Sequence, residues 1–361
     1  MQLIAGVYGN SNRDDYLATK AVDHSGGSLK LTWFDDSVRS LQVPEEATKL
    51  TLTKIPEEFP RNVIKSRAGG GSVNTRIAAA FIADLLGEKR EIRQLDAQDP
   101  EALVVSELPA PTRWLGLRKC PRNYVVGNRG DKRIFRSPTE AAAPLQPRHR
   151  EDIAWLCEAE TIVLNGPKDV EPVAAILAER DRRRFDLILV LTPALPVEFL
   201  QHVAIPIADT LIGAWDELQF LTGKSPVSVE GAAIAAVRLR RMAPQAQILV
   251  TMGKRGVLSM AAGSTEIIHV ELSGRGGLAA EAQQIVRERP ERLCGAGDAL
   301  AGGVLMRRAF GLSLVSSPGV RRSRVADALA GCASALRWMG VTSPLSAGSF
   351  VIRSVPVAMA A

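Results

Sequence analysis

The sequence contains few of the residues that build metal sites or disulfide frameworks. Its 361 residues include only four cysteines and four histidines. The cysteines form no CxxC pair and the histidines do not cluster with them, which argues against a zinc site. The pattern instead predicts reduced, mostly buried thiols in a reducing compartment. The cysteines are Cys120, Cys157, Cys294 and Cys332.

Long apolar runs are also missing. No segment approaches the ~18 residues that a membrane-spanning helix needs. Residues 1–7 lack the basic start and the long apolar core of a secretory signal. We therefore expect a cytoplasmic protein with no membrane partner.

Charge is not concentrated in any one region. The chain has 45 Lys and Arg against 39 Asp and Glu, a formal net charge of +6. The basic residues are scattered among acidic ones, which is typical of a solvated surface. A nucleic-acid binder is the weakest hypothesis, because it would rest on net charge alone and no basic stripe with interleaved aromatics supports it. We predict no nucleic-acid partner.

What the sequence does contain is a regular alternation of strands and helices. From residue 150 onward, the short apolar runs 161–164, 187–191 and 248–251 are separated by stretches of helical periodicity. Short, fully apolar strands separated by helices indicate a parallel sheet covered on both faces. We predict an α/β fold with a doubly wound, mostly parallel sheet and helices on both faces.

The first half of the chain has a different hydrophobic pattern. Between residues 20 and 60, apolar residues alternate with polar ones at period two, the pattern of half-buried antiparallel strands. Proline-containing, strand-like pieces return between 111 and 147. We predict one domain spanning 1–361, with a small β-sheet lid formed from approximately 15–67 and 111–138.

The most informative motif is the run Cys294-Gly295-Ala296-Gly297-Asp298, followed by a helical stretch. Two glycines one residue apart allow a sharp turn and a close approach of the backbone to a ligand. Free amides at a helix start, with the helix dipole, attract an anion. The motif therefore predicts an anion hole made by Gly295, Ala296 and Gly297.

Asp298 would lie in the first turn of that helix. A carboxylate there is stabilised in its ionised form, which suits a base that accepts a proton from an attacking hydroxyl. Read in isolation, an Asp near a helix start is more often only a cap. The two interpretations stay open on this motif alone.

The run from Gly295 to Ala299, with Gly302 and Gly303 after it, resembles the C-terminal signature of the ribokinase-like (PfkB) carbohydrate kinases. In that family the Gly-Ala-Gly amides form the anion hole and the Asp is the catalytic base. The resemblance spans the chain from about residue 9 to residue 340. It implies a kinase that transfers the ATP γ-phosphoryl group to a hydroxyl of a sugar-like substrate, with Asp298 as the base.

Two further segments follow the family order on the substrate side. Gly9-Asn10-Ser11-Asn12-Arg13-Asp14 is similar to the first-strand turn, and Gly69-Gly70-Gly71-Ser72-Val73-Asn74 resembles the di-glycine motif. The resemblance implies that the sugar is bound by five residues. These are Asn12, Asp14, Gly69, Gly70 and Asn74. Taken alone, Asn12 and Asp14 would be ordinary turn residues.

The nucleotide side has weaker matches. Thr251-Met252-Gly253-Lys254-Arg255-Gly256-Val257 resembles the T-x-G-x-x-G-V segment, which implies nucleotide contacts from Thr251, Gly253 and Gly256. Residues 209–223 are similar to the segment with an N-x-x-E motif, so Glu217 is the expected Mg²⁺ residue. The cofactors implied are ATP and Mg²⁺.

This chain departs from the family pattern at three positions. Ala214 stands where the family usually has Asn, and Arg292 and Leu293 stand where it has Asp-Thr. A monovalent cation is therefore doubtful, and one hypothesis is that Arg292 supplies a fixed positive charge near the phosphates. The segment 271–290 is longer than the family pattern requires, and the sequence does not predict its role.

Two functional hypotheses follow. The first is an ATP-dependent carbohydrate kinase, with a sugar-like small molecule and a nucleotide as partners and a homodimer through the lid as an open expectation. The alternative is a catalytically degenerate relative that binds a sugar or nucleoside without turnover, motivated by the three departures. The acceptor itself is not readable from the sequence.

Overall fold

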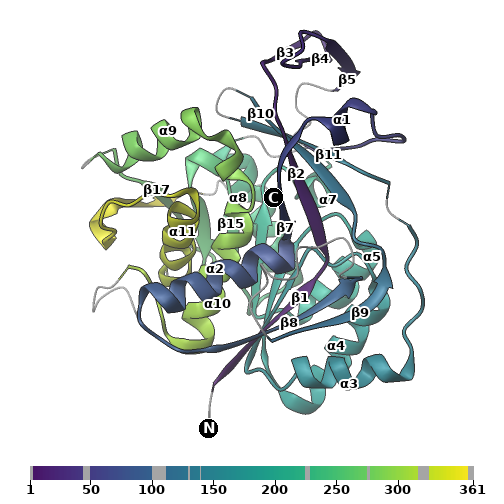
Figure 1. Cartoon of the computed structure of the whole chain (residues 1–361). Helices are drawn as coiled ribbons and strands as arrows, with labels where there is room; N and C mark the ends of the chain where they lie inside the picture. The colour runs from purple at the N-terminus through teal and green to yellow at the C-terminus, as the bar shows by residue number, and fades with distance from the viewer. Residues whose placement is uncertain are drawn as a thin grey trace.

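The computed structural model describes residues 3–43, 49–99, 111–128, 131–138, 140–223, 228–274, 277–315 and 325–356. Its largest feature is a ten-stranded sheet (Figure 1). Neighbouring strands are parallel from β9 to β15, and β16, β17 and β18 continue the sheet antiparallel. In order across the sheet, the strands are β18 Phe350–Val355, β17 Ile267–Leu272, β16 Val257–Met260, β15 Gln247–Thr251, β14 Thr210–Ala214, β13 Asp186–Leu191, β12 Thr161–Asn165, β1 Ile4–Gly9, β8 Glu91–Gln98 and β9 Thr112–Arg118.

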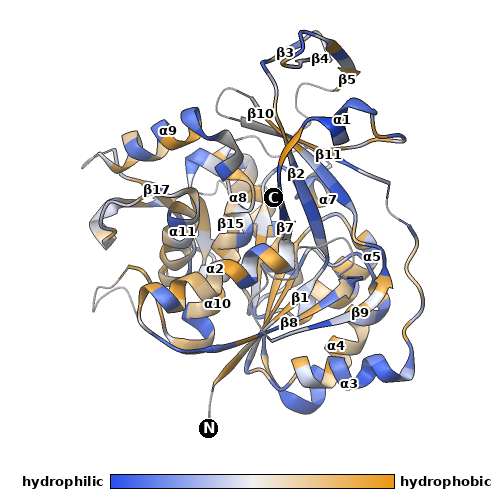
Figure 2. Ribbon diagram, in the orientation of Figure 1, coloured by the Kyte–Doolittle hydropathy of each residue, from blue (hydrophilic) through white to orange (hydrophobic). Residues whose placement is uncertain are grey.

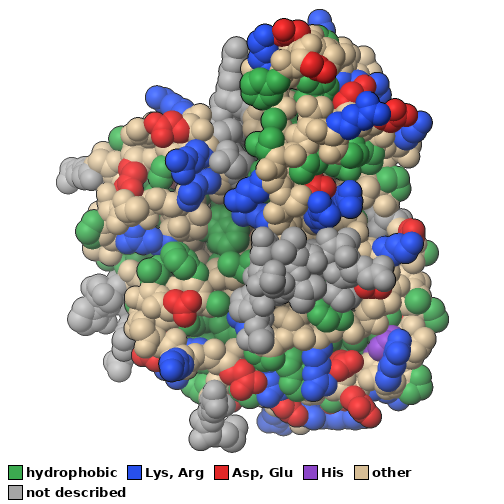
Figure 3. Space-filling model, in the orientation of Figure 1, with side chains coloured by type: hydrophobic (Ala, Val, Ile, Leu, Met, Phe, Trp, Pro, Cys, Tyr) green, Lys and Arg blue, Asp and Glu red, His purple; other side chains and the backbone are tan. Residues whose placement is uncertain are grey.

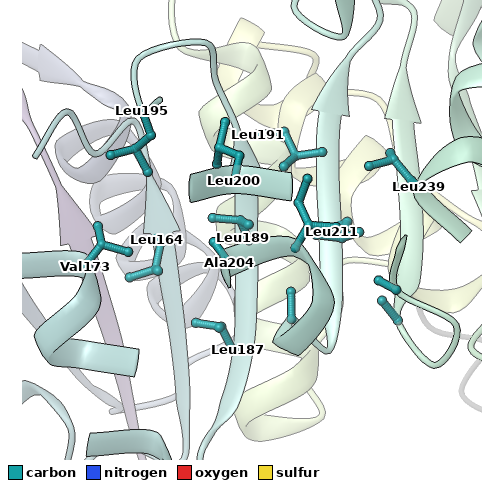
Figure 4. Packing of buried hydrophobic residues seen from close by; sticks show 14 of the residues in the cluster. Leu164, Val173, Leu187, Leu189, Leu191, Leu195, Leu200, Ala204, Leu211 and Leu239 are labelled. Carbon is teal, nitrogen blue, oxygen red and sulfur yellow. The ribbon is translucent and has the colours of Figure 1, made fainter. Parts of the chain in front are cut away.

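The central strands are mainly apolar because each of their faces meets a helical layer. In β12, Ile162 and Leu164 join one hydrophobic cluster and Val163 joins the other. Leu187 and Ile188 of β13 divide in the same way. Figure 4 shows part of the first cluster, in which leucines of β13 pack against the helical segment that follows this strand. The predicted doubly wound, mostly parallel sheet is confirmed.

The helices form two layers (Figure 1). One layer contains α2, α9, α10 and α11, and the other contains α3, α4 and α8. Helix α9 occupies most of the 271–290 stretch and packs on α11. The bounds are α2 Gly71–Leu85, α9 Leu278–Glu288, α10 Ala296–Phe310, α11 Ala326–Met339, α3 Pro147–Leu156, α4 Val170–Arg183 and α8 Val229–Met242, with short helices at α1 Glu58–Arg61, α5 Val197–Phe199, α6 Ile205–Ile207 and α7 Gln219–Thr222.

A separate five-stranded sheet lies beyond one end of β1. Strand β2 continues directly from β1 into it, and β2 is hydrophilic where β1 is hydrophobic (Figure 2). Within it, β2 pairs antiparallel with β7 and parallel with β10. The strands in order are β6 Lys49–Thr51, β11 Asp131–Arg136, β10 Arg122–Asn128, β2 Ser11–Leu17 and β7 Val63–Gly70.

A third, three-stranded antiparallel sheet packs against the second. Its strands are β3 Ala21–Ser25, β4 Ser28–Thr32 and β5 Val38–Gln42. The shared core is aromatic: Phe59 lies 6.0 Å from Trp33, 5.4 Å from Tyr124 and 5.4 Å from Phe135, measured between ring centroids. Such aromatic pairs add to the stabilisation from burial. The small sheet predicted outside the main one is therefore present, as two sheets that share a core.

The predicted range 111–138 for the lid was wrong in its first part. Residues 112–118 form β9, which is the edge strand of the ten-stranded sheet and pairs with β8. The physical reason is burial: Leu115 and Leu117 are in the core cluster under that sheet. Residues 44–48 and 129–130 of the predicted lid lie outside the described residues. The remaining boundaries of the domain and the lid stay a prediction.

The surface charges, the helices and the cysteines can each be compared with what the composition predicts. On the face drawn in Figure 3, Lys and Arg side chains are interspersed with Asp and Glu. Among the helices of the described ranges, none is both long and apolar enough to cross a membrane. All four cysteines lie outside disulfide bonds, and three of them are buried.

The close crossing of α10 and α11 gives a stability prediction. A Cβ on Gly303 would lie 2.5 Å from the Ala330 carbonyl oxygen, whereas a Cβ on Gly274 would meet nothing within 4 Å. Gly303→Ala should lower the free energy of unfolding by about 1–3 kcal/mol, the usual cost of overpacking. Urea denaturation would measure it, with Gly274→Ala as the matched control. Equal stability of the two variants would contradict the close crossing.

Candidate active site

The path of β1 into β2 carries polar residues over the carboxyl end of the main sheet. At the junction, a Cβ on Gly9 would lie 1.9 Å from the Asn165 carbonyl oxygen, so only glycine allows β1 and β12 to end this close together. The carboxyl ends of adjacent parallel strands are where α/β folds bind ligands. Asn12 and Asp14 follow immediately on β2.

The antiparallel register of β2 and β7 brings the first-strand turn and the di-glycine motif together. Asn12 lies opposite Gly69. A Cβ on Gly69 would lie 2.2 Å from Asp14 Oδ2 and 2.7 Å from Asn12 Oδ1. Gly70 has a φ of 97°, and its Cβ would lie 2.5 Å from the Asn10 carbonyl oxygen. The two glycines thus make room for the polar groups of β2.

Asp14 is held firmly, at 2% exposure. Asn123 Nδ2 donates to Asp14 Oδ1 at 3.0 Å, and the Cys294 thiol donates to Asp14 Oδ2 at 3.7 Å. Asn12 differs, because its Oδ1 is buried and has no hydrogen-bond partner among the residues the structure describes. A buried acceptor without a partner costs free energy unless a ligand supplies a donor.

The Asp298 carboxylate lies in the first turn of α10, between two amide side chains. Asn74 Nδ2 donates to Asp298 Oδ2 at 2.9 Å, and Asn165 Nδ2 donates to Asp298 Oδ1 at 3.1 Å. The Thr75 hydroxyl donates to the Asp298 carbonyl oxygen at 3.1 Å. These bonds join the amino ends of α2 and α10, which are more than 200 residues apart in the chain. Asn74 Oδ1 is a second buried acceptor that lacks a partner within the described part of the chain.

The glycine loop before Asp298 has one packed side and one open side. Gly295 has a φ of 83°, and its Cβ would lie 2.9 Å from both Asn74 Nδ2 and Trp338 Cζ2. A Cβ on Gly297 would meet no atom within 4 Å. Because the first amides of a helix have no intrahelical acceptor, the open side presents unsatisfied donors and the positive end of the α10 dipole.

Three of the polar residues that support this arrangement were not predicted from the sequence. Asn165 ends the buried strand β12, and its amide also lies 2.8 Å from Thr75 Oγ1 and 3.2 Å from the Gly71 carbonyl. A lone polar residue at the carboxyl end of an apolar strand was the available signal. Asn123 lies in β10, where no sequence pattern marks it.

Asp96, the third, is completely buried near the end of β8. It accepts from the Ser11 amide at 3.1 Å, the Ser11 hydroxyl at 3.0 Å and the Ser72 hydroxyl at 2.8 Å. It therefore joins the start of β2 to the start of α2. Burial raises the pKa of the Asp96 carboxyl, and the hydrogen bonds only partly oppose that rise.

The residues predicted for the nucleotide lie further along the same edge of the sheet. Thr251 ends β15, and the Trp215 amide donates to the Thr251 carbonyl at 3.0 Å. Gly256 has a structural requirement of its own, since its Cβ would lie 2.1 Å from the Val270 carbonyl oxygen. Gly253 has a φ of 58° and open space around it. In the sheet order, β15 is separated from β12 by β13 and β14, so these residues form a second group beside the Asp298 group.

The described residues around Glu217, which was predicted to bind Mg²⁺, do not form a preorganised metal site. Glu217 is half-buried in the turn after β14, and its amide donates to the Ala214 carbonyl at 2.9 Å. In the part of the chain that the structure describes, no group of three or more His, Cys, Asp or Glu side chains is placed to hold a metal ion. A Mg²⁺ ion held mainly by nucleotide phosphates needs few protein ligands.

The structure places Arg292 and Cys294 in packing roles. Arg292 Nη1 donates to the Met339 carbonyl at 3.4 Å, at the carboxyl end of α11, where a cation is favourable. The guanidinium also approaches Gly340, where a Cβ would lie 2.5 Å from Arg292 Nη1, so it lies at this helix end. Cys294 is buried in a cluster with Tyr16, Val125 and Ile134 of the second sheet.

Comparison with known proteins agrees with the fold. The chain has the architecture of the ribokinase-like α/β kinases. It is similar to Escherichia coli phosphofructokinase-2 in complex with substrates and products (16% identity, 93% of this chain and 94% of that chain, TM-score 0.57). It is also similar to a PfkB protein from Polaromonas sp. JS666 (15% identity, 94% and 95%, TM-score 0.54) and to the tetrameric inhibited form of the E. coli enzyme (14% identity, 93% and 100%, TM-score 0.50). At identities this low, the structural similarity shows the fold alone.

The family is shown by sequence. The model of the pfkB family of carbohydrate kinases matches residues 121–318, which is more than half of the chain. The chain belongs to this family, and membership supports a sugar kinase activity in general. No curated protein matches the chain.

A lysine beside the site gives a pH prediction. Burial, together with Arg136 and Arg118, lowers the pKa of Lys168 to about 8. A base whose pKa is lower in the folded than in the unfolded state opposes folding once it is protonated, so its unfavourable effect grows as the pH falls from about 10.5 through about 8. Lys168→Met should therefore be more stable than the parent at pH 7, with the difference shrinking towards pH 10. Thermal unfolding across this range measures it, and a difference independent of pH would contradict it.

The contact between Asn165 and Asp298 gives a second prediction. Asn165→Ala removes one of the two amides that hold the carboxylate, so the carboxylate should lose its orientation. We expect phosphoryl transfer to fall about 10-fold or more, in line with the cost of small misplacements in active sites. Steady-state kinetics would measure it, and Gln247→Ala, a buried polar residue at the start of β15, is the control. Unchanged turnover in Asn165→Ala would show that Asn165 does not position Asp298.

Proposed function

We propose that this chain transfers the γ-phosphoryl group of ATP to a hydroxyl of a sugar or sugar-like small molecule. The observation that carries the proposal is the Asp298 carboxylate, fixed between the Asn74 and Asn165 amides directly after an open glycine loop. A base and an anion-binding loop in adjacent positions are what phosphoryl transfer to an alcohol requires.

A polyol substrate is supported by two buried acceptor oxygens at the candidate site. Asn12 Oδ1 and Asn74 Oδ1 are both buried without partners among the described residues. Both acceptors lie beside the glycines of the site, since a Cβ on Gly69 would touch Asn12 and a Cβ on Gly295 would touch Asn74. Hydroxyl groups of a sugar can donate to both oxygens. In this proposal Asp14, Gly69 and Gly70 complete the substrate side.

The proposed reaction moves one proton and one phosphoryl group. The substrate hydroxyl loses its proton to the Asp298 carboxylate while its oxygen forms a bond to the γ-phosphorus. The bond from that phosphorus to the β-phosphate oxygen breaks, and ADP leaves. Amides of Gly295, Ala296 and Gly297 would stabilise the negative charge on the transferring group.

The nucleotide would extend from this loop towards the β15 end. Thr251, Gly253 and Gly256 are the proposed contacts there. Mg²⁺ would enter with the phosphates and neutralise part of their charge, with Glu217 as the proposed protein group. The residues at this end fit a nucleotide-borne ion better than a resident one, because they provide no preformed metal cluster within the described ranges.

The second sheet supports the exclusion of water. Its strands β2, β10 and β11 pack through Tyr16, Val125 and Ile134 onto Cys294, immediately before the glycine loop. A cover at this position would keep water from competing as phosphoryl acceptor. A homodimer through this sheet, and a cytoplasmic location, stay predictions.

The alternative is a relative that binds without turnover. It is favoured by Ala214, Arg292 and Leu293, which depart from the family pattern, and by the position of Arg292 at the end of α11. The intact Asp298 group favours catalysis over this alternative.

The test is ADP release across a panel of sugars, nucleosides and sugar phosphates, run beside Asp298→Asn. Loss of the base should lower kcat by about 10²–10⁴-fold, the usual contribution of a general base, with little change in stability. Asp181→Asn, at an exposed position on α4, is the control. A fully active Asp298→Asn protein would contradict the proposal. Substrate binding without ADP release in the parent protein would favour the alternative.

A further inference from the structure

Arg67 connects the second sheet to the loop in front of α10. It lies on β7, directly opposite Asp14 on β2. Its side chain reaches out of that sheet, and Nη2 donates to the Cys294 carbonyl oxygen at 3.2 Å. The two residues are 227 positions apart in the chain. Neither the substrate-side motifs nor the glycine loop predicts this contact.

The guanidinium lies between two aromatic rings. Arg67 Cζ is 5.3 Å from the ring centroid of Tyr16 and 5.5 Å from that of Trp338. Both distances are within the range of cation–π attraction. Burial alone would lower the pKa of Arg67, but Tyr16, Cys294 and Asp14 outweigh it and raise the pKa, so the side chain stays charged.

A second donor acts on the same carbonyl. Trp338 Nε1, from α11, donates to the Cys294 oxygen at 2.7 Å. This oxygen therefore accepts one hydrogen bond from β7 and one from α11. Hydrogen bonds to a carbonyl also polarise its peptide group, which strengthens the N–H on the other side as a donor.

Peptide geometry gives these contacts a consequence for the site. The Cys294 carbonyl and the Gly295 N–H belong to one planar, trans peptide group, in which they point in opposite directions. Fixing the carbonyl on the side of Arg67 and Trp338 therefore turns the Gly295 N–H to the opposite side. Gly295 is the first residue of the proposed anion hole.

We propose that Arg67, together with Trp338, is a positioning residue that orients the Cys294–Gly295 peptide and so aims the first amide of the anion loop. This inference rests on the proposed function for its catalytic consequence. Because Arg67 shares a strand with Gly69 and Gly70, the same contact couples the substrate-side strands to the phosphate-side loop.

The test uses variants that remove the contacts one at a time. Arg67→Met keeps the apolar stem but loses charge and donor, Arg67→Lys keeps the charge, and Trp338→Phe keeps a ring without the donor. Lys65→Met is the matched control, because Lys65 is exposed on the same strand. Two readouts are measured: kcat and KM for the best acceptor, and affinity for a non-hydrolysable ATP analogue by calorimetry.

We expect Arg67→Met to lower kcat about 10-fold to 100-fold and to weaken binding of the analogue, with KM for the acceptor changed less than about 3-fold. Arg67→Lys should recover part of the loss. Trp338→Phe should have a smaller effect, and the double variant should be non-additive because both donors act on one oxygen. A mere packing role would lower stability without this split between kcat and KM.

The outcomes separate the two proposals. If the parent turns over and Arg67→Met keeps both kcat and affinity for the analogue, the role of Arg67 is overturned and the kinase function stands. If the parent binds the analogue without turnover and Arg67→Met weakens that binding, the positioning role is supported and catalysis is not. If additive effects are found for Arg67→Met and Trp338→Phe, the shared-carbonyl mechanism is overturned.

Discussion

The arrangement of this molecule depends on one set of hydrogen bonds, those that hold the Asp298 carboxylate between Asn74 and Asn165. They join the first turns of α2 and α10 to the end of β12. Each helix start is preceded by a glycine with positive φ, at Gly70 and Gly295. Both helices therefore direct their positive ends towards the same place, and the Asp298 carboxylate and the glycine loop can be adjacent only if that convergence is maintained.

The second sheet forms the other side of the candidate site. Strand β1 is buried in the core of the main sheet, and β2 continues from it. The position of β1 therefore fixes where the polar residues of β2 lie. Buried Asp96 reinforces this, since it bonds to Ser11 on one side and to Ser72 on the other. The residues proposed to bind the substrate are thus positioned by two hydrogen-bonded sheets, which favours precise geometry at the candidate site.

Several residues take a different role from the one that a linear motif indicates. Gly256 lies in a nucleotide-like motif, yet its close approach to the Val270 carbonyl already demands glycine. Arg292 stands where the family has an acidic residue, and it caps α11. Residues 112–118 were predicted for the lid, but their apolar side chains complete the main core. In each case a packing constraint from a distant strand or helix outweighed the local pattern.

The sequence by itself determined the doubly wound sheet, the existence of a small separate sheet and the helix that starts after Gly295. These follow from periodicity, glycine and capping preferences, which act over a few neighbouring residues. The membership of Asn12, Asp14, Gly69, Asn74 and Asp298 in one site was predicted only through family order, and their proximity is now visible in the structure. The roles of Asn165, Asp96, Asn123 and Arg67 were decided only by the tertiary structure. Their partners are 24 to 227 positions away in the chain, and pairing over such separations is set by strand order and helix packing, which no local pattern encodes.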